Sequence, residues 1–205
     1  MTAQAPIIGI ERHRLTTDGE GVTTLVAFHT CTLKCQFCLN PQSLSKPENY
    51  PVYTPQEVYD EVVIDNIYFL ATGGGITFGG GEPCLRSDFI AQFSEICGDR
   101  WNLSIETALN VPQHHIKQLL PIVNHWFIDI KDMNPDIYQH YTGKDNNLVL
   151  NNLQLILKLN LQEHVTLRIP LIPGYNSPDD CNHSQAALQD MGFTRFDRFT
   201  YTTKR

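Results

Sequence analysis

The chain has 205 residues, of which 41% are hydrophobic and 18% are charged, and this composition predicts one globular domain, 1–205, with a substantial core. The formal net charge is −7 and no basic run offsets it locally, so we do not expect a nucleic-acid partner. No segment approaches 18 consecutive apolar residues, and the N-terminus lacks a signal-type apolar core. These features predict a cytoplasmic protein with no membrane partner.

Short β-rich runs alternate with helical patterns along the chain. We expect strands at 22–28, 75–78, 102–106, 125–131, 164–169 and 196–202. We expect helices at 54–63, 87–97, 111–123, 147–159 and 180–191. The first helix has a strong start signal, because Thr54 and Glu57 form a capping-box pattern around Pro55.

This alternation of strands and helices predicts an α/β fold with a parallel sheet and right-handed crossovers. A closed eight-unit barrel takes roughly 250 residues, or about 31 for each unit. By the same arithmetic this chain has room for about six units. We therefore expect a partial (β/α)6 barrel of the TIM type.

The most distinctive motif is a C-x3-C-x2-C array, formed by Cys31, Cys35 and Cys38 directly after the apolar run at 25–30. Three thiolates can hold three irons of a 4Fe-4S cluster and leave the fourth iron open to an outside molecule. Structural zinc is an alternative, but zinc loops usually supply a second Cys or Cys/His pair, and none lies near this array. The other cysteines are isolated, and we expect them to be buried as small apolar side chains: Cys84, Cys97 and Cys181.

Further motifs follow the expected strands, where parallel α/β proteins bind their ligands. They are GGGEP after the second strand, SIET at the third, FIDIK at the fourth and LRIP at the fifth. The glycine run is not a Walker loop, because no Lys-Ser or Lys-Thr follows it; a plain turn or a close approach to a ligand remains. Asp129 and Lys131 share one face of a strand, which also suits an ordinary ion pair.

Taken together, these motifs resemble the radical S-adenosylmethionine (SAM) enzymes, and within them the glycyl-radical-enzyme activating enzymes of the pyruvate formate-lyase activating enzyme type. The resemblance covers nearly the whole chain, through GIERHRLTTDGEGVTTLVAFHTCTLKCQFCLNPQ, GGGITFGGGEP, SIETALN, FIDIKDMNPDIYQHYTG and LRIPLIPGYN. It implies a partial barrel that is open on one side and can admit a loop of a large substrate. Many relatives carry a ferredoxin-like insert with extra cysteines; this chain has no such run, so we expect one cluster.

The resemblance also implies roles for individual residues. The three clustered cysteines would ligate the 4Fe-4S cluster, and the remaining SAM contacts would come from Phe37, Cys38, Gly80, Gly81, Glu82, Asp129, Ile130, Lys131 and Arg168. A monovalent cation, Na+ or K+, would bind Glu106, Thr107 and Asp129, although the family has aspartate where this chain has Glu106. Leu39 and Thr202 stand where family members often have histidine, and Asp18 matches the aspartate of a family VDGPG motif.

The implied activity is reductive cleavage of SAM to methionine and a 5'-deoxyadenosyl radical, which removes a hydrogen from a glycine Cα of a partner glycyl radical enzyme. A flavodoxin or ferredoxin would supply the electron to what we expect to be a monomer. No general base is required for hydrogen-atom abstraction, so we expect no catalytic acid or base. Two alternatives are a radical SAM enzyme acting on a small molecule and a non-catalytic Fe-S electron-transfer protein.

Overall fold

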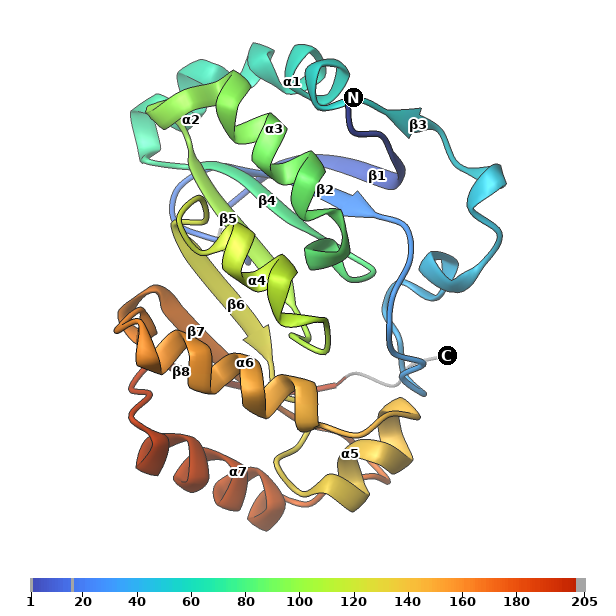
Figure 1. The fold of residues 1–205 in the computed structure, drawn as a ribbon, viewed down its shortest axis with the longest axis vertical. Helices are drawn as coiled ribbons and strands as arrows, with labels where there is room; N and C mark the ends of the chain where they lie inside the picture. The colour runs from blue at the N-terminus through green and yellow to red at the C-terminus, as the bar shows by residue number, and fades with distance from the viewer. Residues whose placement is uncertain (1, 16, 202–205) are drawn as a thin grey trace.

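A single mixed sheet organises the fold in the computed structural model, which describes residues 2–15 and 17–201 (Figure 1). The strand order is β3-β1-β2-β4-β5-β6-β7-β8. Six neighbouring strands are parallel: β2 (Thr23–Phe28), β4 (Gly75–Gly80), β5 (Asn102–Thr107), β6 (His125–Asp129), β7 (Val165–Leu171) and β8 (Phe196–Thr200). They confirm the six expected strands and the partial-barrel fold, with β3 and β8 at opposite edges of a sheet that does not close.

Two strands were not predicted. β1 (Ala5–Arg14) pairs antiparallel with β2, and the two-residue β3 (Val52–Tyr53) pairs antiparallel with β1. The β1 sequence APIIGIERHR lacks clean alternation, because only its first half has buried positions. An edge strand of this kind gives a weak sequence signal.

Among the residues that the structure describes, seven α-helices connect the strands: α1 (Pro55–Val62), α2 (Asn66–Thr72), α3 (Ser87–Cys97), α4 (Gln113–Leu119), α5 (Pro135–Thr142), α6 (Asn147–Lys158) and α7 (Pro178–Met191). Figure 1 shows α1 at the top, α4 near the middle and α7 at the bottom. The capping box is present, with Glu57 N donating to Thr54 Oγ1 at 3.2 Å and Thr54 N donating to Glu57 Oε2 at 2.7 Å. The short helices α2 and α5 were not predicted.

The strands have one apolar face and one polar face, because successive side chains point to opposite sides. The apolar face packs under the helices and includes Leu103, Ile105, Trp126, Ile128 and Leu167. We call the opposite, polar face the inner face; it carries Ser104, Glu106, His125, Asp129, Thr166 and Arg168. The three isolated cysteines are buried, as predicted.

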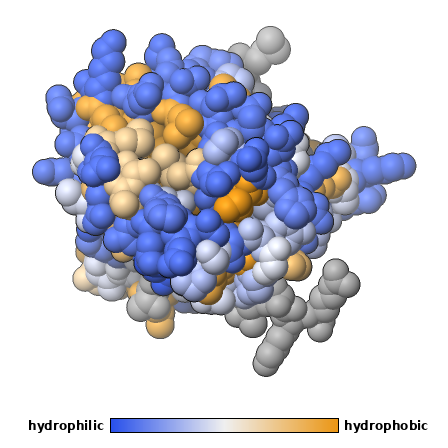
Figure 2. All heavy atoms as spheres, turned by 90° about the horizontal axis from the view of Figure 1, so that it is seen from below, coloured by the Kyte–Doolittle hydropathy of each residue, from blue (hydrophilic) through white to orange (hydrophobic). Residues whose placement is uncertain are grey.

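The surface seen from below is largely hydrophilic, with smaller apolar areas between the polar residues (Figure 2). Isolated exposed apolar residues are common on protein surfaces. Within residues 2–15 and 17–201, none of the helices combines the length and the apolar character needed to cross a membrane.

Candidate cofactor site

The carboxyl ends of the parallel strands and the cysteine-containing loop enclose a pocket of about 450 Å³. Most of the residues that the sequence singles out line this pocket: Cys31, Cys35, Phe37, Cys38, Gly80, Gly81, Glu106, Thr107, Asp129, Lys131 and Arg168. The side chains of Glu82 and Ile130 do not line it. The structure therefore brings together residues that are up to 137 positions apart, because they lie on or just after five neighbouring parallel strands, β2 and β4 to β7.

Backbone hydrogen bonds fix the loop that carries the three cysteines. Thr30, which has a positive φ of 86°, donates from its amide to Ser43 O at 3.0 Å. Lys34 N donates to Thr142 O at 3.0 Å, which ties the loop to the end of α5. Leu33 N lies 3.5 Å from Cys31 Sγ, so the loop also supplies an amide donor to one sulfur. The thiols are thus held at the pocket rather than on a free segment.

The cysteines are partly buried, and this affects their protonation. Burial, together with the nearby Glu82, raises the pKa of Cys31 to about 12, and burial also raises the pKa of Cys35. Iron binding therefore has to displace protons from these thiols. No three His, Cys, Asp or Glu side chains of residues 2–15 and 17–201 form a group that could hold a single metal ion. A cubane cluster needs no such group, since it spreads its ligands over separate irons.

The glycines of the GGGEP motif pack against the cysteine loop at very close range. A Cβ on Gly81 would lie 2.3 Å from Thr30 O, so no side chain fits there. Gly80 has a φ of +95°, and its carbonyl accepts a hydrogen bond from Asn40 Nδ2 at 3.1 Å. These glycines therefore lie close to the backbone of the cysteine-containing loop, on the side of the pocket where the cysteines lie.

Glu82 differs from its predicted role as a pocket carboxylate. Its side chain is fully buried and accepts hydrogen bonds from Thr107 Oγ1 at 2.6 Å, Ala108 N at 3.0 Å and Cys84 N at 3.1 Å. Burial raises the pKa of Glu82 in spite of these donors. Glu82 thus joins the end of β4 to the end of β5 from inside the core.

Ile130 is also turned away from the pocket. It is 1% exposed and belongs to the hydrophobic core. Its amide donates to Arg168 O at 2.9 Å, which continues the pairing of β6 with β7 past the end of β6. Its side chain therefore contributes packing, while its neighbours Asp129 and Lys131 reach the pocket.

Lys131 is a buried cation at the pocket. Its Nζ lies 2.9 Å from Asp129 Oδ2 and donates to the Tyr201 hydroxyl at 2.9 Å. Burial alone would lower the pKa of Lys131, but Asp129 and Tyr201 outweigh it and raise the pKa well above its usual value. The ion pair expected from the strand periodicity is present, and it holds a positive charge at the pocket.

Arg168 makes a second ion pair beside the first. Its Nη1 lies 2.5 Å from Glu106 Oε1, its Nη2 donates to Thr17 O at 2.7 Å, and its guanidinium lies 4.6 Å from the Phe127 ring centroid. Burial raises the pKa of Glu106 more than Arg168 lowers it. Asp129 contributes a second carboxylate to this part of the pocket.

The monovalent-cation site stays a prediction. All three of its expected side chains have protein partners, because Glu106 pairs with Arg168, Thr107 donates to Glu82 and Asp129 pairs with Lys131. Thr202, at the position of a family histidine, lies outside the described residues. Leu39 is 75% exposed at the pocket.

Sequence reasoning missed several side chains of this pocket. Tyr201 and Tyr141 are buried and form an aromatic group with Phe37. Asp18 was noted only as a family match; it is buried, lines the pocket and pairs with Arg14. No local pattern marks these tyrosines, since aromatic residues at such spacings usually belong to the core.

Residues 25–180 match the sequence model described as the Radical SAM superfamily. The chain belongs to the radical SAM superfamily. Membership implies a 4Fe-4S cluster and SAM as cofactors. This radical SAM protein fits them chemically, because its three thiols meet partly buried cationic and anionic side chains in one pocket.

Two curated relatives are similar to this radical SAM protein. The (2S)-3-sulfopropanediol dehydratase activating enzyme of Klebsiella oxytoca is 36% identical over 123 residues, which cover 59% of the chain and 38% of the relative. The pyruvate formate-lyase-activating enzyme of Staphylococcus aureus is 29% identical over 172 residues, which cover 80% of the chain and 68% of the relative. The chain therefore spans well under half of the first relative and about two thirds of the second.

Solved structures of low sequence identity share the fold. SuiB from Streptococcus suis, crystallised with SAM, has a TM-score of 0.65 and 14% identity, covering 85% of this chain and 39% of SuiB. QueE from Escherichia coli has a TM-score of 0.55 and 11% identity, covering 97% of this chain and 95% of QueE. At these identities the likeness supports the partial-barrel fold alone.

Proposed function

We propose that this radical SAM protein is a glycyl-radical-enzyme activating enzyme. The observation that carries the proposal is the meeting of Cys31, Cys35 and Cys38 with two partly buried ion pairs in one pocket at the ends of the parallel strands. Both curated relatives are named as activating enzymes, which favours a protein substrate over a small molecule. The partner is then a glycyl radical enzyme, and the reductant is a flavodoxin or ferredoxin.

When bound, the cluster and SAM supply the radical that removes a hydrogen atom from a glycine Cα of the partner. The three cysteines would hold the cluster at the pocket. Lys131 and Arg168 offer cations for the carboxylate of SAM, and Asp129 offers an acceptor for its ammonium. Phe37 offers an aromatic face beside Cys38. The chain thus positions its cofactors and needs no acid or base of its own.

The open side of the sheet suits a protein substrate. The strand order ends at β8 on one side and at β3 on the other, and these edge strands do not pair with each other. A substrate loop can therefore approach the pocket from the inner face without unfolding of the barrel. A closed barrel would admit ligands only through its carboxyl end.

The proposal is tested by anoxic reconstitution with iron and sulfide, reduction, addition of SAM and measurement of 5'-deoxyadenosine. We expect product with the native protein, and a glycyl radical signal in electron paramagnetic resonance when the correct partner is added. Cys35→Ala should lower the bound iron and abolish product, whereas the control Cys97→Ala, at a buried cysteine that does not line the pocket, should retain both.

The outcomes separate the alternatives. A loaded, reducible cluster that yields no 5'-deoxyadenosine with any candidate partner would favour the electron-transfer role. Product formation with a small molecule, without a glycyl radical in any partner, would favour a small-molecule radical enzyme. Full iron loading and activity in Cys35→Ala would overturn the assignment of the cluster ligands.

A further inference from the structure

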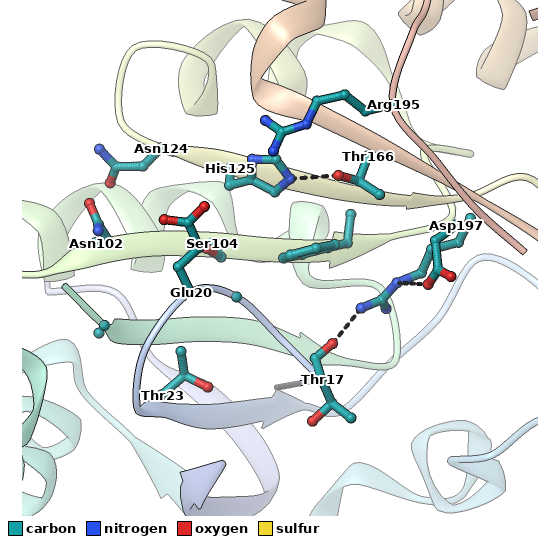
Figure 3. Close-up of a pocket in the computed structure, with 15 residues that line it drawn as sticks. Thr17, Glu20, Thr23, Asn102, Ser104, Asn124, His125, Thr166, Arg195 and Asp197 are labelled. Carbon is teal, nitrogen blue, oxygen red and sulfur yellow. Dashed lines mark hydrogen bonds and ion pairs between the residues drawn. The ribbon is translucent and has the colours of Figure 1, made fainter. Parts of the chain in front are cut away.

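A second cavity of about 450 Å³ lies on the inner face, toward the amino ends of the strands. Ser104, His125 and Thr166 line it from the neighbouring strands β5, β6 and β7 (Figure 3). The interior of a closed barrel at this level is normally filled by branched apolar side chains. Here short polar side chains and glycines leave the space open.

This second cavity is distinct from the cofactor pocket. None of the three clustered cysteines lines it, and neither does Lys131. The two spaces share Thr17, Arg168 and Asp197, and the 2.7 Å hydrogen bond from Arg168 Nη2 to Thr17 O lies at this boundary (Figure 3). The second cavity is therefore not explained by the cluster or by SAM.

The strand residues of the cavity offer neutral hydrogen-bonding groups. His125 Nε2 lies 2.9 Å from Thr166 Oγ1. Burial, and then the nearby Arg195, lower the pKa of His125 to about 4, so its imidazole is neutral at pH 7. The Ser104 hydroxyl makes no hydrogen bond to another residue of the described chain. These groups can donate to or accept from the hydroxyl of a ligand.

Arg195 lines the cavity as a solvent-exposed cation, alongside the carboxylates of Glu20 and Asp197. Its Nη1 donates to the carbonyl oxygen of Glu163 at 3.0 Å, but it forms no salt bridge within residues 2–15 and 17–201. Figure 3 shows Arg195 next to His125 at this cavity. Arg168, by contrast, already pairs with Glu106. A guanidinium without a carboxylate partner is a natural contact for a carboxylate ligand.

The two carboxylates of the cavity limit how much negative charge a bound ligand can carry. Glu20 and Asp197 also line it, and either carboxylate would repel a multiply charged anion such as phosphate. A ligand with one carboxylate and at least one hydroxyl group has the single negative charge and the hydrogen-bonding group that this cavity can accommodate. Its charge matches Arg195, and its hydroxyl groups match Ser104, Thr166 and the neutral His125.

We propose that the second cavity binds a small hydroxycarboxylate, with Arg195 pairing with the carboxylate and Ser104, His125 and Thr166 contacting its hydroxyl group. The volume lies within the range of small-molecule pockets. This site goes beyond the radical chemistry of the cofactor pocket and does not depend on which partner is activated.

The test is isothermal titration calorimetry of the cluster-loaded protein, kept anoxic and saturated with SAM so that the cofactor pocket is filled. The probes are L-lactate and D-glycerate, with neutral lactamide as the matched compound. We expect at least one of the two acids to bind, and lactamide to bind about tenfold more weakly or not at all. Arg195→Gln should weaken binding of the acid by about tenfold or more.

Arg198→Gln is the matched control, because Arg198 is an exposed arginine three residues away that donates to Asn182 and does not line the cavity. It should bind the acid as the native protein does. Ser104→Ala tests the cavity independently of charge and should also weaken binding. Circular dichroism confirms that each variant is folded.

The proposal is overturned if neither acid binds, if lactamide binds as well as lactate, or if Arg195→Gln and Arg198→Gln behave alike. It is also overturned if Lys131→Gln removes acid binding while Arg195→Gln preserves it. That pattern would assign the acid to the cofactor pocket.

Discussion

Replacing Glu82 with glutamine tests whether this carboxyl group is a core residue, as the structure has it, or a ligand-binding group of the pocket. The buried carboxyl accepts from Thr107 Oγ1, Ala108 N and Cys84 N. A glutamine side chain keeps one acceptor oxygen and presents an amide group that cannot accept from a backbone N–H. One buried donor is then left without a partner, which costs about 1–3 kcal/mol of unfolding free energy.

The pH dependence of that cost follows from the direction of the pKa shift. Burial raises the pKa of Glu82 in the folded protein above its ordinary value of 4.5. Between pH 4.5 and this raised pKa the folded state binds more protons than the unfolded state. The contribution of Glu82 to stability therefore falls as pH rises through this window. Glutamine does not titrate. The loss of stability in Glu82→Gln should therefore be largest near pH 5 and become smaller toward pH 8.

Urea unfolding of the native protein and of Glu82→Gln between pH 5 and pH 8 measures this difference. Glu57→Gln is the control, because hydrogen bonds from Thr54 lower the pKa of the exposed Glu57 below 4.5. Its stabilising contribution is fully present above pH 4.5 and is lost only below it, so the stability deficit of Glu57→Gln should stay constant between pH 5 and pH 8. If the deficit of Glu82→Gln stayed constant or grew with pH in this range, the raised pKa of Glu82 in the folded protein would be wrong.

Two further substitutions test the two sides of the cofactor pocket. Gly81→Ala should destabilise the protein by about 1–3 kcal/mol in urea unfolding, because the added Cβ would lie 2.3 Å from Thr30 O. The control Gly9→Ala should not destabilise it, because a Cβ on Gly9 would have nothing within 4 Å. Equal effects of the two substitutions would refute the close packing at Gly81. Tyr201→Phe should lower the free energy of unfolding by about 1.5–3 kcal/mol and weaken SAM binding in calorimetry, because it removes the hydroxyl that accepts a hydrogen bond from Lys131. Unchanged stability and affinity would show that Asp129 alone positions the Lys131 cation.

The sequence was sufficient to predict the features that depend on a repeated pattern or a short motif. The six parallel strands follow from runs such as 75–78 and 102–106, each followed by a helical pattern. The start of α1 follows from the local hydrogen bonds of Thr54 and Glu57, which need no tertiary context. The convergence of the three cysteines with Lys131 follows from the rule that parallel strands end at one edge.

The features that sequence reasoning missed depend on contacts between distant segments. Nothing within the GGGEP motif shows that Glu82 is turned into the core, because its partner Thr107 is 25 positions away. Tyr201 lies 70 positions from Lys131, and its role appears only when β8 lies beside β7. The antiparallel strand β1 has weak alternation of its own and is fixed mainly by its pairing with β2.

The two faces of the sheet explain why the polar site extends beyond the family motifs. On β5, β6 and β7 the residues that build the core alternate with residues that face the open interior, so a motif at the end of a strand has polar neighbours further down the same strand. Arg168 lies where these two levels meet, since it pairs with Glu106 above and shares a cavity with His125 below. Any ligand that moved Arg168 from Glu106 would change the charge at both cavities, which couples the inner face to the cofactor pocket through Arg168.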